Sequence, residues 1–210
     1  MLIKRRVTGF TVIELVVALV VFGALLAVGL PVFNVWTQNS QVRTAAAAIQ
    51  NGLQFAKAEA VRRNAQVRFQ LTDRLDNNCV ISTAGNNWVV SYDDPTSACG
   101  ANLLNEAFPV SDTTNNPAPR IIQTKPAAEG GGRVLVTADR AVAIFNGFGR
   151  LAPVAPATAA EALSIDVDAQ NGDGDCSTAG TAKCLRVVVT IGGQIRTCDP
   201  TLPTGDPQRC

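Results

Sequence analysis

The sequence predicts an α+β fold, in which one long amino-terminal helix packs on a head domain of antiparallel β-sheet. Residues 10–33 form an apolar run, and residues 41–64 carry apolar side chains at steps of three and four, as helices do. Beyond Asn64, short segments rich in Val, Ile and Phe alternate with turn residues, a pattern typical of strands. With 210 residues in all, the part that follows the helix is large enough for one domain.

The apolar run is long enough to cross a membrane. As a helix, residues 10–33 would extend about 36 Å, whereas the hydrocarbon core of a bilayer is about 30 Å thick. Lys4, Arg5 and Arg6 precede the run and no acid occurs before Glu14, which predicts an amino end in the cytoplasm. A cleaved secretory signal, with a small-x-small site at residues 27–29, and an uncleaved signal anchor remain alternatives. Neither alternative explains Glu14, because a carboxylate in the bilayer core costs about 2.5–3.5 kcal/mol.

Residues 4–33, KRRVTGFTVIELVVALVVFGALLAVGLPVF, resemble the class III signal of type IV pilins and type II secretion pseudopilins. The resemblance implies that a prepilin peptidase cuts between Gly9 and Phe10 and that the new amine of Phe10 is methylated. Glu14 then becomes the fifth residue of the mature chain and Pro31 the twenty-second, as the family pattern requires. The implied partner of Glu14 is the Phe10 amine of a neighbouring subunit. Assembly would then pair a carboxylate that has no partner after membrane insertion.

The helix is expected to continue to about Asn64 and to bury one stripe against the head. Its middle is weakened by Gly23, Gly29 and Pro31, because proline removes an amide donor and glycine lowers helix propensity. The predicted apolar stripe consists of Val42, Ala45, Ile49, Leu53, Ala56 and Ala60. The expected division is a leader (1–9), a transmembrane or filament-core helix (10–33), an amphipathic half of the same helix (34–64) and a periplasmic β head (65–210).

Seven strands are expected in the head domain. Their predicted ranges are 65–71, 87–92, 133–137, 141–145, 163–167, 185–191 and 194–197. Between the last two, Gly192 and Gly193 predict a hairpin turn in which both glycines can take positive φ. Residues 93–132 are rich in proline and contain a run of three glycines, so we expect a long surface excursion with room for one irregular strand.

The layout as a whole is similar to the GspH/FimT family of minor pilins and minor pseudopilins. The similarity is carried by RTAAAAIQNGLQFAKAEAVRRNAQVRF (43–69), FNGFGR (145–150) and LRVVVTIGGQIRTCDP (185–200). It implies a low-copy subunit that primes or caps a filament made mostly of another pilin, without catalysis or cofactor. The implied partners are other minor and major pilins, the prepilin peptidase and the inner membrane. We favour a type IV pilus because the ending CDPTLPTGDPQRC resembles pilus members; the minor pseudopilin H of type II secretion is the alternative.

Six cysteines follow the apolar run and are expected to form disulfides in the oxidising periplasm. Six cysteines allow fifteen connectivities. Pairing of sequence neighbours would clip a loop each time, and buried unpaired thiols are the alternative. The expected pairs are Cys79 with Cys99, Cys176 with Cys184, and Cys198 with Cys210.

The composition argues against an enzyme. The chain contains no histidine, which excludes a His-based triad, a His proton shuttle and His-ligated zinc. No glycine-rich loop has the spacing that binds phosphate. Loss of Lys4, Arg5 and Arg6 with the leader lowers the 18 basic side chains to 15, against 17 acidic ones, so no overall basic field would hold nucleic acid.

One candidate metal site is a stretch of crowded acids, Asp166, Asp168, Asp173 and Asp175, whose oxygens could bind a hard cation such as calcium. The stretch departs from the standard calcium loop, because Asn171 stands where the glycine belongs and no Glu closes the loop. A solvated, turn-rich loop is the competing interpretation.

One candidate DNA site lies at the carboxyl end. Some FimT-type proteins are implicated in DNA uptake through a Gly-Arg-x-Arg hairpin, and here the aligned residues 193–196 read Gly-Gln-Ile-Arg. Solvated arginines beside a disulfide are the competing interpretation, because Asp199 and Asp206 dilute the charge. The residues that could gather on one face and neutralise phosphates are Lys183, Arg186, Arg196 and Arg209.

Overall fold

The computed structural model describes residues 11–130, 133–170, 176 and 183–210, and Gly9 and Phe10 lie outside this set. The chain divides into two compact units, residues 1–37 and residues 38–210. Helix α1 (Val12–Arg63) contributes to both, and it is not interrupted at Gly23, Gly29 or Pro31. Among the described residues, no helix combines the length and the apolar character needed to cross a membrane.

In the second unit, α1 buries the stripe that the sequence predicts: Val42, Ala45, Ile49, Leu53, Ala56 and Ala60 are all buried. The helix ends in a Schellman motif. Asn64 adopts a positive φ of 48°, the amide of Ala65 donates to the carbonyl of Ala60, and the amide of Asn64 donates to that of Val61. The cationic side chains of Arg62 and Arg63 in the last turn favour the same end point.

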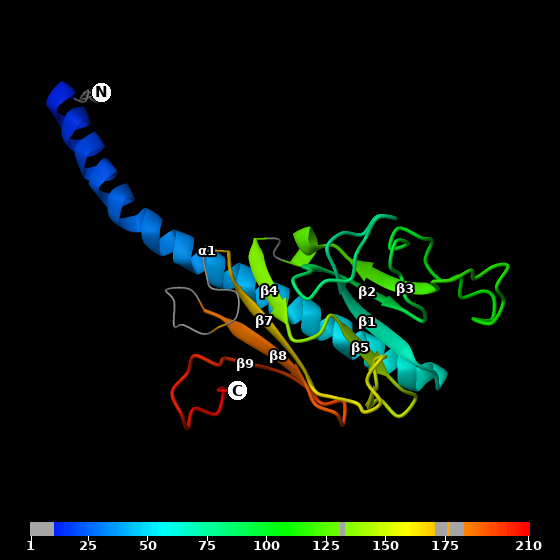
Figure 1. The fold of residues 1–210 in the computed structure, drawn as a ribbon. Coiled ribbons are helices and arrows are strands. Elements are labelled where there is room, and N and C mark those ends of the chain that lie inside the picture. Colours follow the sequence, from blue (N-terminus) through cyan, green and yellow to red (C-terminus); the bar gives the residue numbers. More distant parts are fainter. Residues whose placement is uncertain (1–10, 131–132, 171–175, 177–182) are drawn as a thin grey trace, which may run out of the picture. The chain divides into compact units, whose positions relative to one another are not determined.

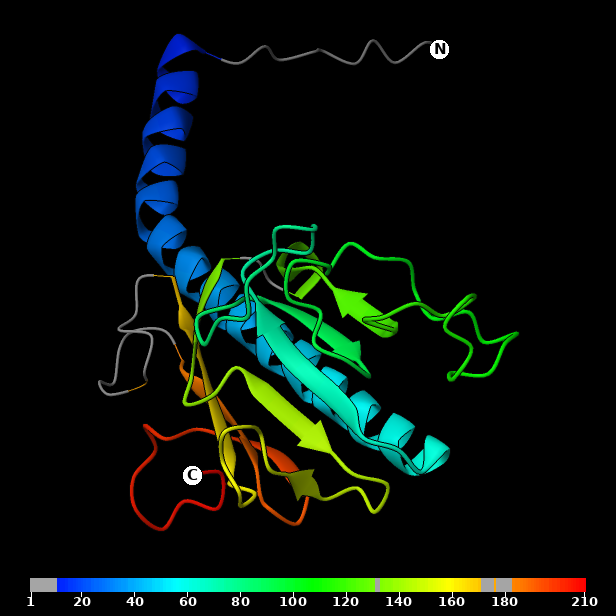
Figure 2. The ribbon, with the colours of Figure 1, turned by 45° about the vertical axis from the view of Figure 1, so that its right-hand side comes forward.

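The head contains two antiparallel sheets, and the second half of α1 packs on both of them (Figures 1 and 2). The five-stranded sheet has the order β3-β2-β1-β5-β6, and the four-stranded sheet has the order β4-β7-β8-β9. The strands are β1 (Val67–Thr72), β2 (Asn87–Ser91), β3 (Ile121–Lys125), β4 (Val134–Ala138), β5 (Val142–Phe145), β6 (Leu151–Ala152), β7 (Leu163–Ala169), β8 (Leu185–Val189) and β9 (Ile195–Cys198).

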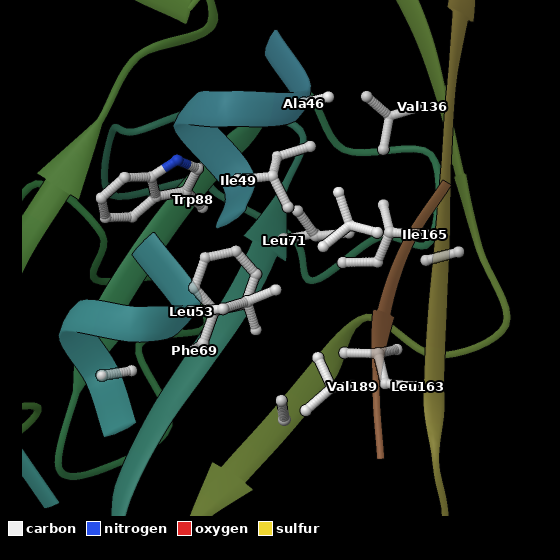
Figure 3. Packing of buried hydrophobic residues seen from close by; sticks show 14 of the residues in the cluster. Ala46, Ile49, Leu53, Phe69, Leu71, Trp88, Val136, Leu163, Ile165 and Val189 are labelled. Atoms are coloured by element: carbon white, nitrogen blue, oxygen red, sulfur yellow. The ribbon is translucent and has the colours of Figure 1, made fainter. Parts of the chain in front are cut away.

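The core lies where the helix meets both sheets. Figure 3 shows Ile49 and Leu53 of α1 together with side chains from the two sheets. The five-stranded sheet contributes Phe69, Leu71 and Trp88, and the four-stranded sheet contributes Val136, Leu163, Ile165 and Val189. One stripe of small and medium apolar residues on α1 therefore packs against two separate sheets and completes a single core.

All seven expected strands are present, with ends shifted by at most two residues. β3 is the strand of the proline-rich excursion, and β6 was not predicted, because a two-residue strand has no readable alternation. Of the two glycines in the turn between β8 and β9, Gly193 takes a positive φ of 81° and Gly192 does not.

The disulfides join Cys79 to Cys99, Cys176 to Cys184 and Cys198 to Cys210, which are the pairs of sequence neighbours. Cys79 and Cys99 are buried with Val89 and Ile121 in a second, smaller apolar cluster. This cluster attaches the long excursion to the five-stranded sheet, because Val89 belongs to β2 and Ile121 to β3. Burial and cross-link together hold a segment that has little regular structure.

Candidate assembly surface

Glu14 lies in the first turn of α1 and is exposed. Its backbone N–H donates to Oγ1 of Thr11 over 3.3 Å, so Thr11 caps the helix and Glu14 occupies the third helical position. Thr-x-x-Glu is the sequence of a capping box, in which the acid also suits the positive end of the helix. Sequence reasoning missed this local role, although the spacing of Thr11 and Glu14 contains it.

The described residues around Glu14 present large apolar side chains to the exterior. In unit 1 these are Val12, Ile13, Leu15, Val16, Val17, Leu19, Val20, Val21, Phe22, Leu25, Leu26, Phe33 and Trp36. An apolar surface of this extent needs a lipid or protein partner. Pro31 lies within the helix, but its side chain falls outside the description.

Within the second unit, the β8–β9 hairpin turn packs on α1 and on the turn of residues 146–150. Nζ of Lys57 donates to the carbonyl of Gly193 over 2.8 Å. A Cβ on Gly193 would lie 1.9 Å from the carbonyl oxygen of Gly149, so glycine is required by contact as well as by φ. The hairpin that was considered for DNA is therefore held firmly against the helix.

The candidate DNA residues differ in their surroundings. Arg186 on β8 lies directly opposite Asp166 on β7, and its guanidinium donates two hydrogen bonds to that carboxylate, of 2.5 and 2.8 Å. Arg209 donates to the hydroxyl of Thr204. Within the part of the chain that the structure describes, Arg196 is exposed and forms no ion pair. The structure thus leaves one of the three arginines available and commits Arg186 to a carboxylate.

The candidate metal ligands are affected by the same pair. Asp166 is occupied by Arg186, and Oδ1 of the buried Asp168 accepts a hydrogen bond from the amide of Ala169 over 2.7 Å. Asp173 and Asp175 lie outside the described residues. In the ranges that are described, no three acidic or cysteine side chains gather as a metal site would require.

Comparison with known proteins decides the family. A family model described as type II transport protein GspH matches residues 45–193, and a prokaryotic N-terminal methylation motif matches residues 4–30. The chain belongs to the GspH family. It is a minor pilin or pseudopilin of the type IV pilus and type II secretion kind, and its fold and family are those of structural pilins.

Two solved structures are similar to this GspH-family chain, both of the type IV minor pilin FimU from Pseudomonas aeruginosa strain PAO1. The match to the first structure has 13% sequence identity and a TM-score of 0.44, and it spans 83% of this chain and 98% of the FimU chain. The other has 16% identity and a TM-score of 0.41, and covers 80% and 98%. Among curated proteins, no match is found.

In this GspH-family head, a charged network links the end of α1 to the excursion. Glu59 accepts hydrogen bonds from Arg62 and Arg63, and both arginines also reach Glu106, over 3.2 and 2.6 Å. Burial raises the pKa of Glu59, but the hydrogen bonds from Arg62 and Arg63 lower it further, so its pKa lies below the usual value. The folded state therefore favours the ionised carboxylate.

A tyrosine lies between two cations beside this network. The guanidinium carbons of Arg63 and Arg120 lie 5.9 and 5.5 Å from the centre of the Tyr92 ring. Arg120 also pairs with Asp93, with hydrogen bonds of 2.6 and 2.5 Å. Burial raises the pKa of the Tyr92 phenol. These charged contacts fix the excursion to the helix at the place where Tyr92 packs against the main apolar cluster.

We expect Glu59→Gln to lower the free energy of unfolding by about 1–3 kcal/mol at neutral pH, because two arginines lose a charged acceptor. A carboxyl whose pKa is lowered by folding stabilises the fold above its unfolded pKa of about 4.3, and this stabilisation is lost as pH falls through the folded pKa. The wild-type protein should therefore lose more stability between about pH 5 and pH 3 than the variant. Thermal unfolding followed by circular dichroism across this range measures the difference.

Glu106→Gln is the matched control, because Glu106 contacts the same arginines but its side chain is 65% exposed. Its effect should be within about 0.5 kcal/mol. Asp73 and Asp112, whose pKa values are also lowered, titrate in both proteins and cancel in the comparison. Equal acid sensitivity of the Glu59→Gln variant and the wild type would contradict the assignment.

Proposed function

We propose that this chain primes or caps assembly of a type IV pilus after cleavage between Gly9 and Phe10. In the filament, Glu14 pairs with the amino-terminal amine of a neighbouring subunit. The observation that carries the proposal is the position of Glu14, one charged residue among exposed apolar side chains at the start of α1. An acid in such surroundings is stable in a low-dielectric contact only when a cation meets it there.

Before assembly, residues 10–33 anchor the chain in the inner membrane by a single span, with the head in the periplasm. Three observations support this location: the methylation motif that matches residues 4–30, the basic residues that precede the run, and three disulfides in the head. Other pilins and the prepilin peptidase are the partners that this route requires. The role is structural rather than catalytic.

Minor pseudopilin H of a type II secretion system is the second candidate, because the matching family model carries that description. Deleting the gene separates the two. A pilus primer predicts fewer pili per cell, of ordinary length, with secretion unchanged. A pseudopilin predicts accumulation of secreted proteins in the periplasm with normal piliation. Counting pili by electron microscopy and assaying secreted enzymes in the same cultures measures both, and normal piliation would overturn the proposed function.

A further inference from the structure

A groove of about 690 Å³ runs between α1 and β3 in the head. The helix contributes the small residues Thr44, Ala47, Ala48, Asn51 and Gly52 together with Arg43 and Phe55, and the sheet side contributes Trp88, Gln123, Lys125 and Glu129. Its floor and one wall are apolar or small, so an occupant could approach the helix closely. The groove lies entirely within residues 38–210 and is separate from the apolar end of α1.

Trp88 lines this groove with its aromatic ring. The residue is 4% exposed, and its indole Nε1 is buried without a partner among the described residues. Figure 3 shows this nitrogen on the edge of the ring that is turned toward α1. The ring edge lies against Gly52, where a Cβ would be 2.9 Å from Cε2 of Trp88. Because Nε1 is enclosed against α1, an occupant of the groove would meet the aromatic ring of Trp88 rather than this nitrogen.

The second wall of the groove belongs to a sheet edge that is mostly unpaired. β3 is the terminal strand of the five-stranded sheet, and on its outer side the described residues provide only a bridge between Leu103 and Ile121. The amide of Leu104 bonds the carbonyl of Ile121 at that point. Beyond Ile121, no strand in the described part of the chain pairs with the outer edge of Gln123 to Lys125, so this edge could accept a further strand.

The charge of the groove favours an acidic occupant. Arg43 forms no ion pair within the part of the chain that the structure describes, whereas Lys125 pairs with Glu129 over 2.6 Å. The three charged residues of the lining therefore leave one cation uncompensated. Arg43 is exposed, and a carboxylate on the occupant would compensate its charge, a kind of contact that contributes specificity.

We propose that this groove binds an extended segment of another filament subunit, which adds a strand to the free edge of β3. Its helix-facing side chains cover Ala47, Ala48, Phe55 and the ring of Trp88, and place a carboxylate beside Arg43. Strand addition supplies affinity through main-chain hydrogen bonds, and the groove selects the side chains. The inference rests on the proposed function only in taking the partner to be another subunit of the same filament.

The test uses the full-length chain expressed in its own cells with a photo-crosslinking amino acid at Ala47 or at Gln123. Both positions should yield a covalent adduct with another pilin-like subunit, and mass spectrometry should place the joined residues in an extended segment that contains Asp or Glu. The same probe at Val80, which is 55% exposed and outside the groove, should give no such adduct. An adduct to a helix, to a second copy of this chain or to its own residues would overturn the proposal, as would the absence of an adduct.

Charge variants provide a second readout. Arg43→Glu should lower the adduct yield about tenfold because attraction becomes repulsion, and Arg43→Lys should restore most of it. Arg196→Glu makes the same change at another exposed arginine and should leave the yield unaltered. An unchanged yield with Arg43→Glu would remove Arg43 from the site. Pili and secretion assayed in the same cells keep the outcomes separate, because an adduct with a secretion subunit overturns the pilus role and leaves the groove assignment intact.

Discussion

A chain carrying Glu14→Gln is expected to insert into the membrane and to be cleaved, but to enter filaments at least about 100-fold less often than the wild type. The substitution removes the charge that should meet a neighbouring amine in the filament core. Removing one partner of a buried ion pair costs about 3–5 kcal/mol, since the remaining charge stays buried and unpaired. Immunoblotting of sheared pili against the membrane fraction measures the distribution.

Glutamine is chosen as the replacement because Glu14 belongs to the amino-terminal cap of α1. Thr11 caps α1 and Glu14 stands at the third helical position, so the acid has a local role as well as the proposed one. Glutamine can serve in a capping box but carries no charge, whereas Thr11→Ala removes the cap and keeps the acid. Thr11→Ala should destabilise the helix start by about 1 kcal/mol and leave incorporation near normal.

A loss of incorporation in the Thr11→Ala variant would identify helix capping as the function of Glu14. If Thr11→Ala reduced incorporation as much as Glu14→Gln, the defect would follow from the helix start rather than from a missing partner charge. Normal incorporation of both variants would exclude electrostatic docking through this residue. The two substitutions therefore separate a local helix effect from a contact between subunits.

The helix was predictable because its signal is local and repeated. The stripe from Val42 to Ala60 recurs every three or four residues, and each member is buried. The strands of the head were predictable for the same reason, wherever β-branched residues lie between turn residues. β3 could be anticipated only as an irregular strand, because its residues 121–125 follow Pro117 and Pro119 and contain only two apolar side chains.

The two candidate sites show what local patterns cannot supply. Asp166 was grouped with neighbouring acids as a metal site, and Arg186 with neighbouring cations as a DNA site. The register of β7 and β8 places them opposite each other, so each compensates the other. Strand register depends on pairing between distant segments, and neither segment contains that information by itself. The same is true of the groove beside β3, which requires a helix face, a sheet edge and Trp88 together.

Gly52→Leu is expected to lower the free energy of unfolding by about 3 kcal/mol or more. A Cβ at this position would lie 2.8 Å from Cε2 of Phe69 and 2.9 Å from Cε2 and Cζ2 of Trp88. Both rings are buried, so neither can move without displacing the core. For a chain of this size the melting temperature should fall by roughly 6–12 °C, which thermal unfolding of the full chain in detergent measures.

Gly52→Ala sets two effects against each other. Alanine improves helix propensity by about 1 kcal/mol over glycine, whereas overpacking of a filled core costs about 1–3 kcal/mol. We expect overpacking to win, because two buried rings resist the added methyl group. Gly23→Ala in the same helix is the matched control, since a Cβ there meets nothing within 4 Å and only the propensity gain remains. Equal stabilisation by both alanine variants would show that Gly52 is not required for the close approach of Trp88 to α1.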